Sequence, residues 1–446
     1  MAFFFRKKPP TTSGDEPEAV EPETEAPDDE PEVDDSVPPE YDEGAAAIDQ
    51  EWRERAREVI PGGSSTGSKR PEALYGEGNT TGPTHFTRAS GCHVVTAGEV
   101  TLLDCTMALG AVALGYGDER VVRAAITAAA NGNVAGLAHP LEVEVAERLC
   151  EVIPCAEQVR FMKSGAEGVA AAVRIARTAT GRSRVIGCGY FGWLDWWSDA
   201  AGVPAGARAD FQPVPFDDVA ALERACRAAG RELAAVVIEP VIERAPSPEW
   251  IQRARQLCDE LGAVLIFDEM KTGFRLARGG YQEVASVTPD LAVFGKAMAN
   301  GFPIAAVVGR RGVMEAAERT WISSTLAAEA MSLAAVSAVL DVYEQEDVPA
   351  QLARIGAAMR DAVATAAAAS GLPGISVEGL DPMWFVRFED RQMERRFLEL
   401  AMAEGVLFKR GAYNYASLAH DDDDLVVEIE RVASSAFVAL GDSLNE

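Results

Sequence analysis

The chain has 446 residues, 48% of them hydrophobic, and a formal net charge of −29. A chain of this length buries a large core and is expected to form more than one domain. Its acidic surface repels nucleic acid, and no apolar run is long enough to span a membrane, so neither is an expected partner. The basic residues near the start follow the apolar run Phe3–Phe5, whereas a signal peptide has the opposite order. We therefore expect a cytoplasmic protein.

The cysteines and histidines do not suggest a metal site. Seven cysteines occur without a CxxC pair and are interpreted as reduced thiols in the core of a cytosolic enzyme. The four histidines, His85, His93, His139 and His420, are far apart in the sequence. A metal site built from several His and Cys is therefore not expected.

The first 45 residues are predicted to be a disordered acidic tail rich in Pro and Glu. Residues 1–44 hold fifteen Asp or Glu against three Lys or Arg. Such a segment cannot bury enough apolar surface to offset the entropy lost on ordering. Three interpretations stay open: a solubilising tail, a docking arm for a basic partner, and a small anchor formed by the FFFRKK run.

Beyond this segment, helical patterns alternate with short apolar strands. Helices are predicted at 141–152, 168–178 and 248–261, and strands at 183–187, 233–240, 263–269 and 290–296. Near-continuous apolar strands separated by helices predict an α/β fold with a mostly parallel sheet covered by helices on both faces. Ligands of such sheets bind at the carboxyl ends of the strands, which is where Glu239, Asp268 and Lys296 fall.

Lys296 is a candidate for covalent catalysis. Beyond the tail the only lysines are Lys69, Lys163, Lys271, Lys296 and Lys409. A catalytic lysine needs a pocket in which its amine can lose a proton. Lys296 follows the apolar run LAVF and a glycine, which lets the backbone approach a ligand closely. The alternative is a surface lysine whose aliphatic stem covers apolar neighbours.

Asp268 strengthens this interpretation because it directly follows a buried strand, within FDEMKTGFR at 267–275. A carboxylate there is costly unless a cation pairs with it. A protonated pyridine nitrogen is one such partner, and the pairing would keep the ring an electron sink. The alternative is an acid that caps the next turn.

Two further segments could complete a cofactor site. In FMKSGAEG at 161–168, Ser164, Gly165 and Ala166 open a helix whose amides would favour a phosphate, although an ordinary N-cap has the same pattern. In GCGYFGW at 187–193, Tyr190 stands between glycines and could lie flat on a planar cofactor. The nearby Trp193, Trp196 and Trp197 line a pocket or pack a core or subunit contact.

In order and spacing, these segments resemble the class III aminotransferases, most closely the branch of glutamate-1-semialdehyde aminomutase. The resemblance runs from IPGG at 60–63 through SGAE, FDEMKTGFR and FGK to SLAH at 417–420, about residues 55–440. It implies pyridoxal 5′-phosphate (PLP) as cofactor and the PLP fold type I, which is like that of aspartate aminotransferase. It also implies a large PLP-binding domain, a smaller α+β domain, and a homodimer with shared active sites.

The resemblance also implies roles for individual residues. Lys296 matches the lysine that forms a Schiff base with PLP and shuttles the proton, and Asp268 matches the partner of the pyridine nitrogen. Met270 and Tyr190 match the groups on the two ring faces. The phosphate turn is matched by Ser164, Gly165 and Ala166. Glu239 matches a polar residue near the cofactor ring, and Thr325 matches a threonine that reaches the phosphate of the neighbouring subunit.

The sequence departs from the aminomutase pattern at four places. Lys69 falls at or near the position of an arginine that meets a substrate carboxylate, and Leu109 replaces a tryptophan. Ala412 falls at about the position of a gating glutamate, and Phe191 replaces the histidine after Tyr190. These departures weigh against a true aminomutase.

We therefore expect an aminotransferase that moves an amino group from an amino-acid donor to an aldehyde, keto acid or keto sugar. The alternatives are an intramolecular 2,1-aminomutase, a racemase or decarboxylase of the same fold, and a non-catalytic scaffold whose tail recruits a partner. We expect residues 46–110 to contribute to the small domain and substrate pocket. Residues 111–345 would form the PLP-binding domain, and residues 346–446 the C-terminal small domain.

Overall fold

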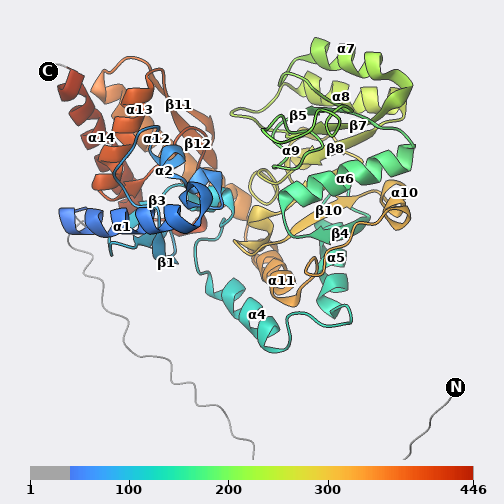
Figure 1. The fold of residues 1–446 in the computed structure, drawn as a ribbon, viewed down its shortest axis with the longest axis horizontal. Coiled ribbons are helices and arrows are strands. Elements are labelled where there is room, and N and C mark those ends of the chain that lie inside the picture. The colour runs from blue at the N-terminus through green and yellow to red at the C-terminus, as the bar shows by residue number, and fades with distance from the viewer. Residues whose placement is uncertain (1–40, 445–446) are drawn as a thin grey trace, which may run out of the picture. The chain divides into compact units, whose positions relative to one another are not determined.

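The computed structural model describes residues 41–444 (Figure 1). Most of the predicted acidic tail, residues 1–40, lies outside this described part. Helix α1 (Glu43–Val59) begins inside the predicted tail, because the Asp42 carboxylate caps it by accepting a hydrogen bond of 2.8 Å from the amide of Ala45.

The largest sheet carries the predicted strands and has the order β4-β10-β9-β8-β7-β5-β6. Its strands are β4 (Gln158–Met162), β5 (Arg184–Cys188), β6 (Phe211–Pro213), β7 (Leu233–Ile238), β8 (Val264–Asp268), β9 (Leu291–Phe294) and β10 (Ala305–Gly309). Strands β6, β5, β7, β8 and β9 pair in parallel, whereas β10 is antiparallel to both β9 and β4. The predicted mostly parallel sheet is confirmed, and β10 is an antiparallel strand that the sequence did not indicate.

Two separate cores cover the faces of this sheet. In β8, Val264 and Ile266 face the core that contains helix α6 (Gly165–Thr180), and Leu265 and Phe267 face the core of helix α8 (Pro248–Leu261). Helix α7 (Val219–Ala229) packs beside α8, and Figure 1 shows α6 on the opposite side of the strands from α8. Because both faces are covered, apolar side chains are needed at every position, which explains the uninterrupted apolar runs.

The N- and C-terminal parts of the described chain form two smaller sheets, of orders β1-β2-β3-β13 and β11-β12-β14. Their strands are β1 (Phe86–Ser90), β2 (His93–Thr96), β3 (Thr101–Asp104), β11 (Ile375–Leu380), β12 (Met383–Phe388), β13 (Val406–Leu407) and β14 (Asn414–Tyr415). Helix α14 (Asp423–Leu444) packs against α12 (Val348–Ser370) and α13 (Arg391–Ala403), and α12 and α13 pack against these strands. Strand β13 pairs in parallel with β3, which joins the two ends of the described chain. The α+β character expected of the smaller part is confirmed, whereas the three domain ranges stay predictions.

The other helices connect these layers. They are α2 (Pro71–Leu74), α3 (Met107–Gly110), α4 (Glu119–Ala130), α5 (Pro140–Val152), α9 (Tyr281–Ala285), α10 (Arg311–Met314) and α11 (Ala330–Gln345). The 3-10 turns are η1 (Pro61–Gly63), η2 (Gly67–Lys69), η3 (Gly230–Glu232), η4 (Lys296–Ala299), η5 (Glu315–Arg319) and η6 (Leu418–His420). No helix within residues 41–444 has the length and apolarity needed to cross a membrane. All seven cysteines are free, and six of them are buried.

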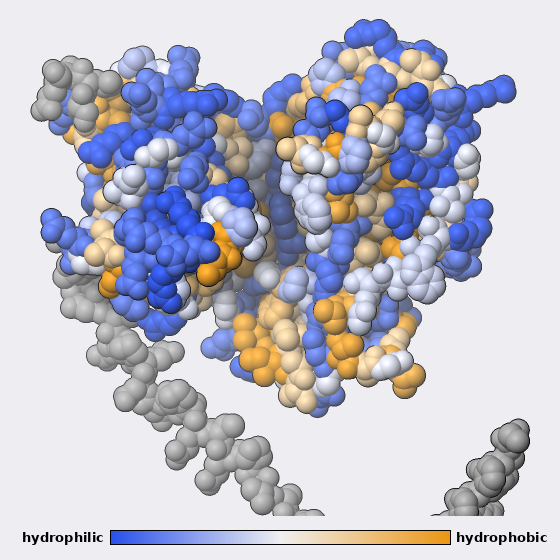
Figure 2. Space-filling model, in the orientation of Figure 1, coloured by the Kyte–Doolittle hydropathy of each residue, from blue (hydrophilic) through white to orange (hydrophobic). Residues whose placement is uncertain are grey.

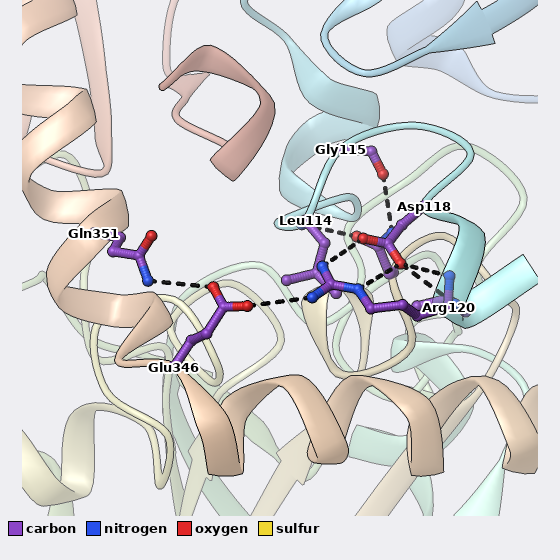
Figure 3. Close-up of polar contacts among 8 residues, drawn as sticks. Leu114, Gly115, Asp118, Arg120, Glu346 and Gln351 are labelled. Carbon is purple, nitrogen blue, oxygen red and sulfur yellow. Dashed lines mark hydrogen bonds and ion pairs between the residues drawn. The ribbon is translucent and has the colours of Figure 1, made fainter. Parts of the chain in front are cut away.

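An ion-pair chain ties the start of α4 to the junction of α11 and α12 (Figure 3). Arg120 reaches the Asp118 carboxylate at 2.7 Å on one side and Glu346 at 3.2 Å on the other. Gln351 of α12 donates a hydrogen bond of 3.4 Å to the second oxygen of Glu346. Arg120 and Glu346 are partly exposed, so their contact contributes little stability, and the effect of the chain is to hold the α4 loop against the two helices.

Candidate active site

Three polar residues lie at the carboxyl ends of three neighbouring strands, as predicted. Glu239 follows β7, Asp268 ends β8, and Lys296 follows β9 after a single glycine. The strands pair in parallel, with Asp268 opposite Val293. The three chain positions therefore share one edge of the sheet.

Asp268 is a buried carboxylate, only 5% exposed. Its Oδ1 accepts a hydrogen bond of 3.1 Å from the amide of Met270. Burial, followed by the negative charge of Glu239, raises the pKa of Asp268 to about 7, and Lys296 and Lys271 offset only part of this rise. No ion pair to Asp268 occurs within the described residues, so its carboxylate is open to a cationic ligand.

Lys296 opens the turn η4 with a left-handed backbone, φ 48°. Burial, followed by the positive charge of Lys271, lowers the pKa of its amine. This shift favours the neutral, nucleophilic form. Asn300 fixes the end of this turn through two hydrogen bonds. Its side chain accepts one of 3.0 Å from the amide of Leu114 and donates one of 2.9 Å to the carbonyl of Gly115.

Met270 fills the space between α6 and the residue before Lys296. A Cβ at Gly165 would lie 2.8 Å from the Met270 methyl carbon, and one at Gly295 would lie 2.5 Å from it. Real Cβ atoms do not approach this closely, so the Met270 side chain would have to shift if either position carried a side chain. Met270 thereby links the start of α6 to the Lys296 turn.

The N-terminus of α6 offers free amides. Ser164 and Glu167 form a capping box in which each side chain accepts from the other's amide, at 3.3 and 3.1 Å. Within the part of the chain that the structure describes, the amides of Gly165 and Ala166 keep no acceptor. Ser164 is thus an N-cap, and the two amides beside it lie at the positive end of the helix dipole, where an anion binds well.

The loop that carries Tyr190 is tied to two other parts of the site. The Tyr190 amide donates a hydrogen bond of 3.0 Å to Glu239 Oε2. A Cβ added at Gly189 would lie 2.4 Å from the Glu239 Cβ. A Cβ at Gly192 would lie 2.3 Å from the Ala166 Cβ. The Tyr190 ring itself is 67% exposed and meets Trp197 edge-on at 5.6 Å.

The tryptophans after Tyr190 divide between packing and exposure. Trp196 and Trp197 pack against the buried ring of Phe191, with centroids 5.7 and 5.4 Å away. Trp193 is exposed. The packing interpretation therefore holds for two of the three.

Thr325 is separate from the other predicted site residues. It is exposed in the segment before α11 and lines a cavity of 540 Å³ with residues 131–140 and 159–162. None of the other eight predicted site residues lines this cavity. Its expected contact is with a neighbouring subunit, and that role stays a prediction.

The profile of the family described as Aminotransferase class-III matches residues 75–193 and 205–423, together more than half of the chain. The chain belongs to the class III aminotransferase family. It is accordingly a PLP-dependent enzyme, and the predicted family, fold type, enzyme class and cofactor are confirmed.

Three proteins illustrate how this class III aminotransferase relates to others. Glutamate-1-semialdehyde 2,1-aminomutase of Opitutus terrae is 33% identical over 420 residues, 86% of this chain and 97% of the relative. The 2′-deamino-2′-hydroxyneamine transaminase of Streptomyces kanamyceticus is 34% identical over 366 residues, 81% and 91% of the two chains. The FumI protein of Sphingopyxis sp. MTA144, solved in its PLP internal aldimine form, has a TM-score of 0.85 at 27% identity, with 90% and 98% covered.

The described residues of this aminotransferase fit PLP chemically. Lys296 supplies a half-buried amine, Asp268 a buried carboxylate without a paired cation, and the α6 amides an anion site. Gly189 and Gly192 leave no room for side chains beside Glu239 and Ala166, and the Met270 side chain fills the space beside Gly165 and Gly295. No three His, Cys, Asp or Glu side chains of residues 41–444 are grouped as metal ligands would be.

Sequence reasoning missed two residues that complete the charge pattern. Lys271 Nζ lies 2.6 Å from Glu239 Oε1 and 3.2 Å from the hydroxyl oxygen of Tyr413. Lys271 could have been found from its position three residues after Asp268. Tyr413 could not, because its segment lies more than a hundred residues away.

Arg275 connects this site to the smaller sheets. It is fully buried and donates to the carbonyl oxygens of Ala416 at 2.7 Å, Pro382 at 3.1 Å and Gly110 at 3.2 Å. Its guanidinium also lies 4.9 Å from the ring centroid of Tyr415. Arg275 thus joins three distant segments behind the site.

Proposed function

We propose that this enzyme transfers an amino group between two molecules, from an amino-acid donor to an aldehyde, keto acid or keto sugar. The observation that carries this proposal is the half-buried Lys296 and the buried, unpaired Asp268 carboxylate at the ends of adjacent strands. The four departures from the aminomutase pattern and the similarity to a transaminase favour transfer between molecules.

Bound PLP would act as the electron sink that makes the Cα–H bond of the donor acidic. In our proposal Lys296 holds the cofactor through its amine and afterwards moves the proton at its Nζ as general base and acid. Asp268 would pair with the pyridine nitrogen, and Met270 and Tyr190 would pack against the two ring faces.

The remaining residues would bind and orient the cofactor. The amides of Gly165 and Ala166, with Ser164 as their cap, would bind the phosphate. Glu239 would lie near the ring, and Thr325 would reach the phosphate of the neighbouring subunit.

The Thr325 role requires a homodimer, which we also propose. Exposed apolar side chains support it: Leu137 is 87% exposed, and Ile126, Val134, Val143 and Leu326 are also exposed on or near α4 and α5. Figure 2 shows hydrophobic residues gathered over these helices. Contiguous exposed apolar surface is typical of a protein interface. The free, mostly buried cysteines support a cytoplasmic location.

A 2,1-aminomutase is the second candidate, because one relative of similar identity has that activity. An aminomutase retains its intermediate, so it releases no keto acid. A transaminase releases one keto acid for each donor consumed.

The first experiment is the near-visible absorption spectrum of the purified protein with PLP, before and after L-glutamate, L-alanine or L-lysine. We expect a band from PLP bound to Lys296 that bleaches with one donor, with stoichiometric keto acid. A band that resists every amino donor would count against transfer from these donors and favour the aminomutase or a racemase. No band would contradict PLP binding at Lys296.

A further inference from the structure

A second lysine, Lys271, lies within the site and is only 10% exposed. Its amine contacts Glu239 Oε1 at 2.6 Å and the Tyr413 hydroxyl oxygen at 3.2 Å, and it lies 4.5 Å from the centroid of the Tyr413 ring. The three residues come from separate segments: the loop after β8, the end of β7, and the segment before β14. The cation is therefore fixed in place rather than free to swing.

Glu239 is held on its other side as well. Its second oxygen accepts from the Tyr190 amide, and Gly189 packs against its Cβ. The Tyr413 hydroxyl in turn accepts from the amide of Glu243. Neither partner of the Lys271–Glu239 pair can move without breaking a second contact.

Lys271 acts electrostatically on Lys296. After burial, Lys271 has the largest effect of the charged groups that face Lys296, and it lowers the pKa of the Lys296 amine. Asp268 and Glu239 raise that pKa, and Arg275 lowers it slightly. Burial alone would lower the pKa of Lys271, but Glu239, with Tyr413 and Tyr415, raises it overall, so Lys271 stays a cation.

We propose that Lys271 is a positioning residue whose fixed positive charge favours the neutral form of the Lys296 amine, and that Glu239 limits this effect by pairing with Lys271. A neighbouring cation is an established way to activate an amine for Schiff-base chemistry. The inference rests on the proposed function, because the neutral amine is the form that takes up PLP.

The test measures the titration of Lys296 in the full-length, PLP-free protein. Trace acetic anhydride is added across a pH series, and peptide mass spectrometry gives the acetylated fraction at Lys296. In Lys271→Met we expect the Lys296 midpoint to rise by about one pH unit or more, since a nearby cation is lost and Glu239 is unpaired. In Glu239→Gln we expect the midpoint to fall, since Lys271 is then uncompensated. Lys271→Arg should keep the wild-type midpoint.

Lys409→Met is the matched control, because Lys409 donates to the carbonyl of Arg410 and is not among the groups that face Lys296. The rate of PLP uptake at a fixed pH below the Lys296 midpoint, followed by the absorption band, should fall about tenfold in Lys271→Met, because there a rise of one unit is a tenfold loss of free amine.

The opposite signs separate charge from structural damage. If water simply enters a damaged site, the Lys296 midpoint rises in both Lys271→Met and Glu239→Gln, which would overturn the inference. An unchanged midpoint in both variants would also overturn it. If the wild-type protein forms no band with PLP, the proposed function fails, whereas the acetylation midpoints still decide the role of Lys271.

Discussion

Replacement of Asp268 by asparagine gives a stability test whose sign depends on pH. Without PLP, the buried carboxyl has a pKa of about 7 against an ordinary value of 3.8. A group whose folded pKa is raised stabilises the protein fully below its unfolded pKa, and this contribution is lost as the pH rises through the folded pKa. The loss for Asp268 therefore falls between about pH 4 and pH 7.

The magnitude follows from the size of the shift. About three pKa units at ~1.4 kcal/mol each give ~4 kcal/mol of folding free energy lost by pH 8. Roughly 3 kcal/mol of this lies above pH 5. Asparagine carries no charge and avoids this loss. Between pH 5 and pH 8.5, the free energy of unfolding of the PLP-free Asp268→Asn variant should therefore rise by roughly 3 kcal/mol relative to that of the wild type.

The assay is thermal unfolding of both PLP-free proteins at pH 5, 7 and 8.5. We expect the midpoint of Asp268→Asn minus that of the wild type to increase at each step. Excess PLP should reverse the order, because the protonated ring nitrogen would supply the cation that Asp268 lacks. A midpoint difference that is flat or decreases with pH would refute the reasoning.

Three further predictions concern single positions. Lys296→Ala should lose turnover while PLP still binds weakly, and retained turnover would overturn the assignment of Lys296. Gly192→Ala should weaken PLP uptake in an absorption titration, because the new Cβ would lie 2.3 Å from the Cβ of Ala166. Gly202→Ala is the control, because Gly202 also has a left-handed backbone but nothing lies within 4 Å of its Cβ position, so this variant should take up PLP normally. Asp290→Asn should destabilise the fold by ~3 kcal/mol, because this buried carboxylate pairs with arginines at 3.1 and 2.8 Å. Asp361→Asn is the control, because Asp361 is exposed in its ion pair, and in urea unfolding this variant should lose less than ~1 kcal/mol of unfolding free energy. Equal losses in Asp290→Asn and Asp361→Asn would contradict the burial argument.

The predicted strands were recoverable because burial on both faces leaves a simple pattern. Strands β5, β7, β8 and β9 were predicted within two residues of their bounds, and α8 was predicted at its observed bounds. The carboxyl ends of β7, β8 and β9 then follow, which is why Glu239, Asp268 and Lys296 could be grouped. The role of each residue in catalysis remains a prediction.

Contacts between distant segments were not recoverable. The capping box at Ser164 is local and was visible in the sequence, but the contact of Lys271 with Tyr413 depends on how the C-terminal part folds back. The antiparallel direction of β10 was equally hidden, because an apolar strand has the same side-chain pattern in either direction. The predicted tail, residues 1–45, extends past the start of α1 at Glu43, because Asp42, which caps this helix, lies in the same acidic stretch.

Strand β10 also limits when the site can form. It inserts between β4 and β9, although more than a hundred residues separate it from β4. Until Gly309 has left the ribosome, β4 has no neighbour in the sheet, and the α6 amides that follow it are not held beside the end of β9. Pairing over such sequence distances is slow because the loop must close before the contacts form. PLP uptake would therefore report that this sheet has finished folding, rather than nucleate it.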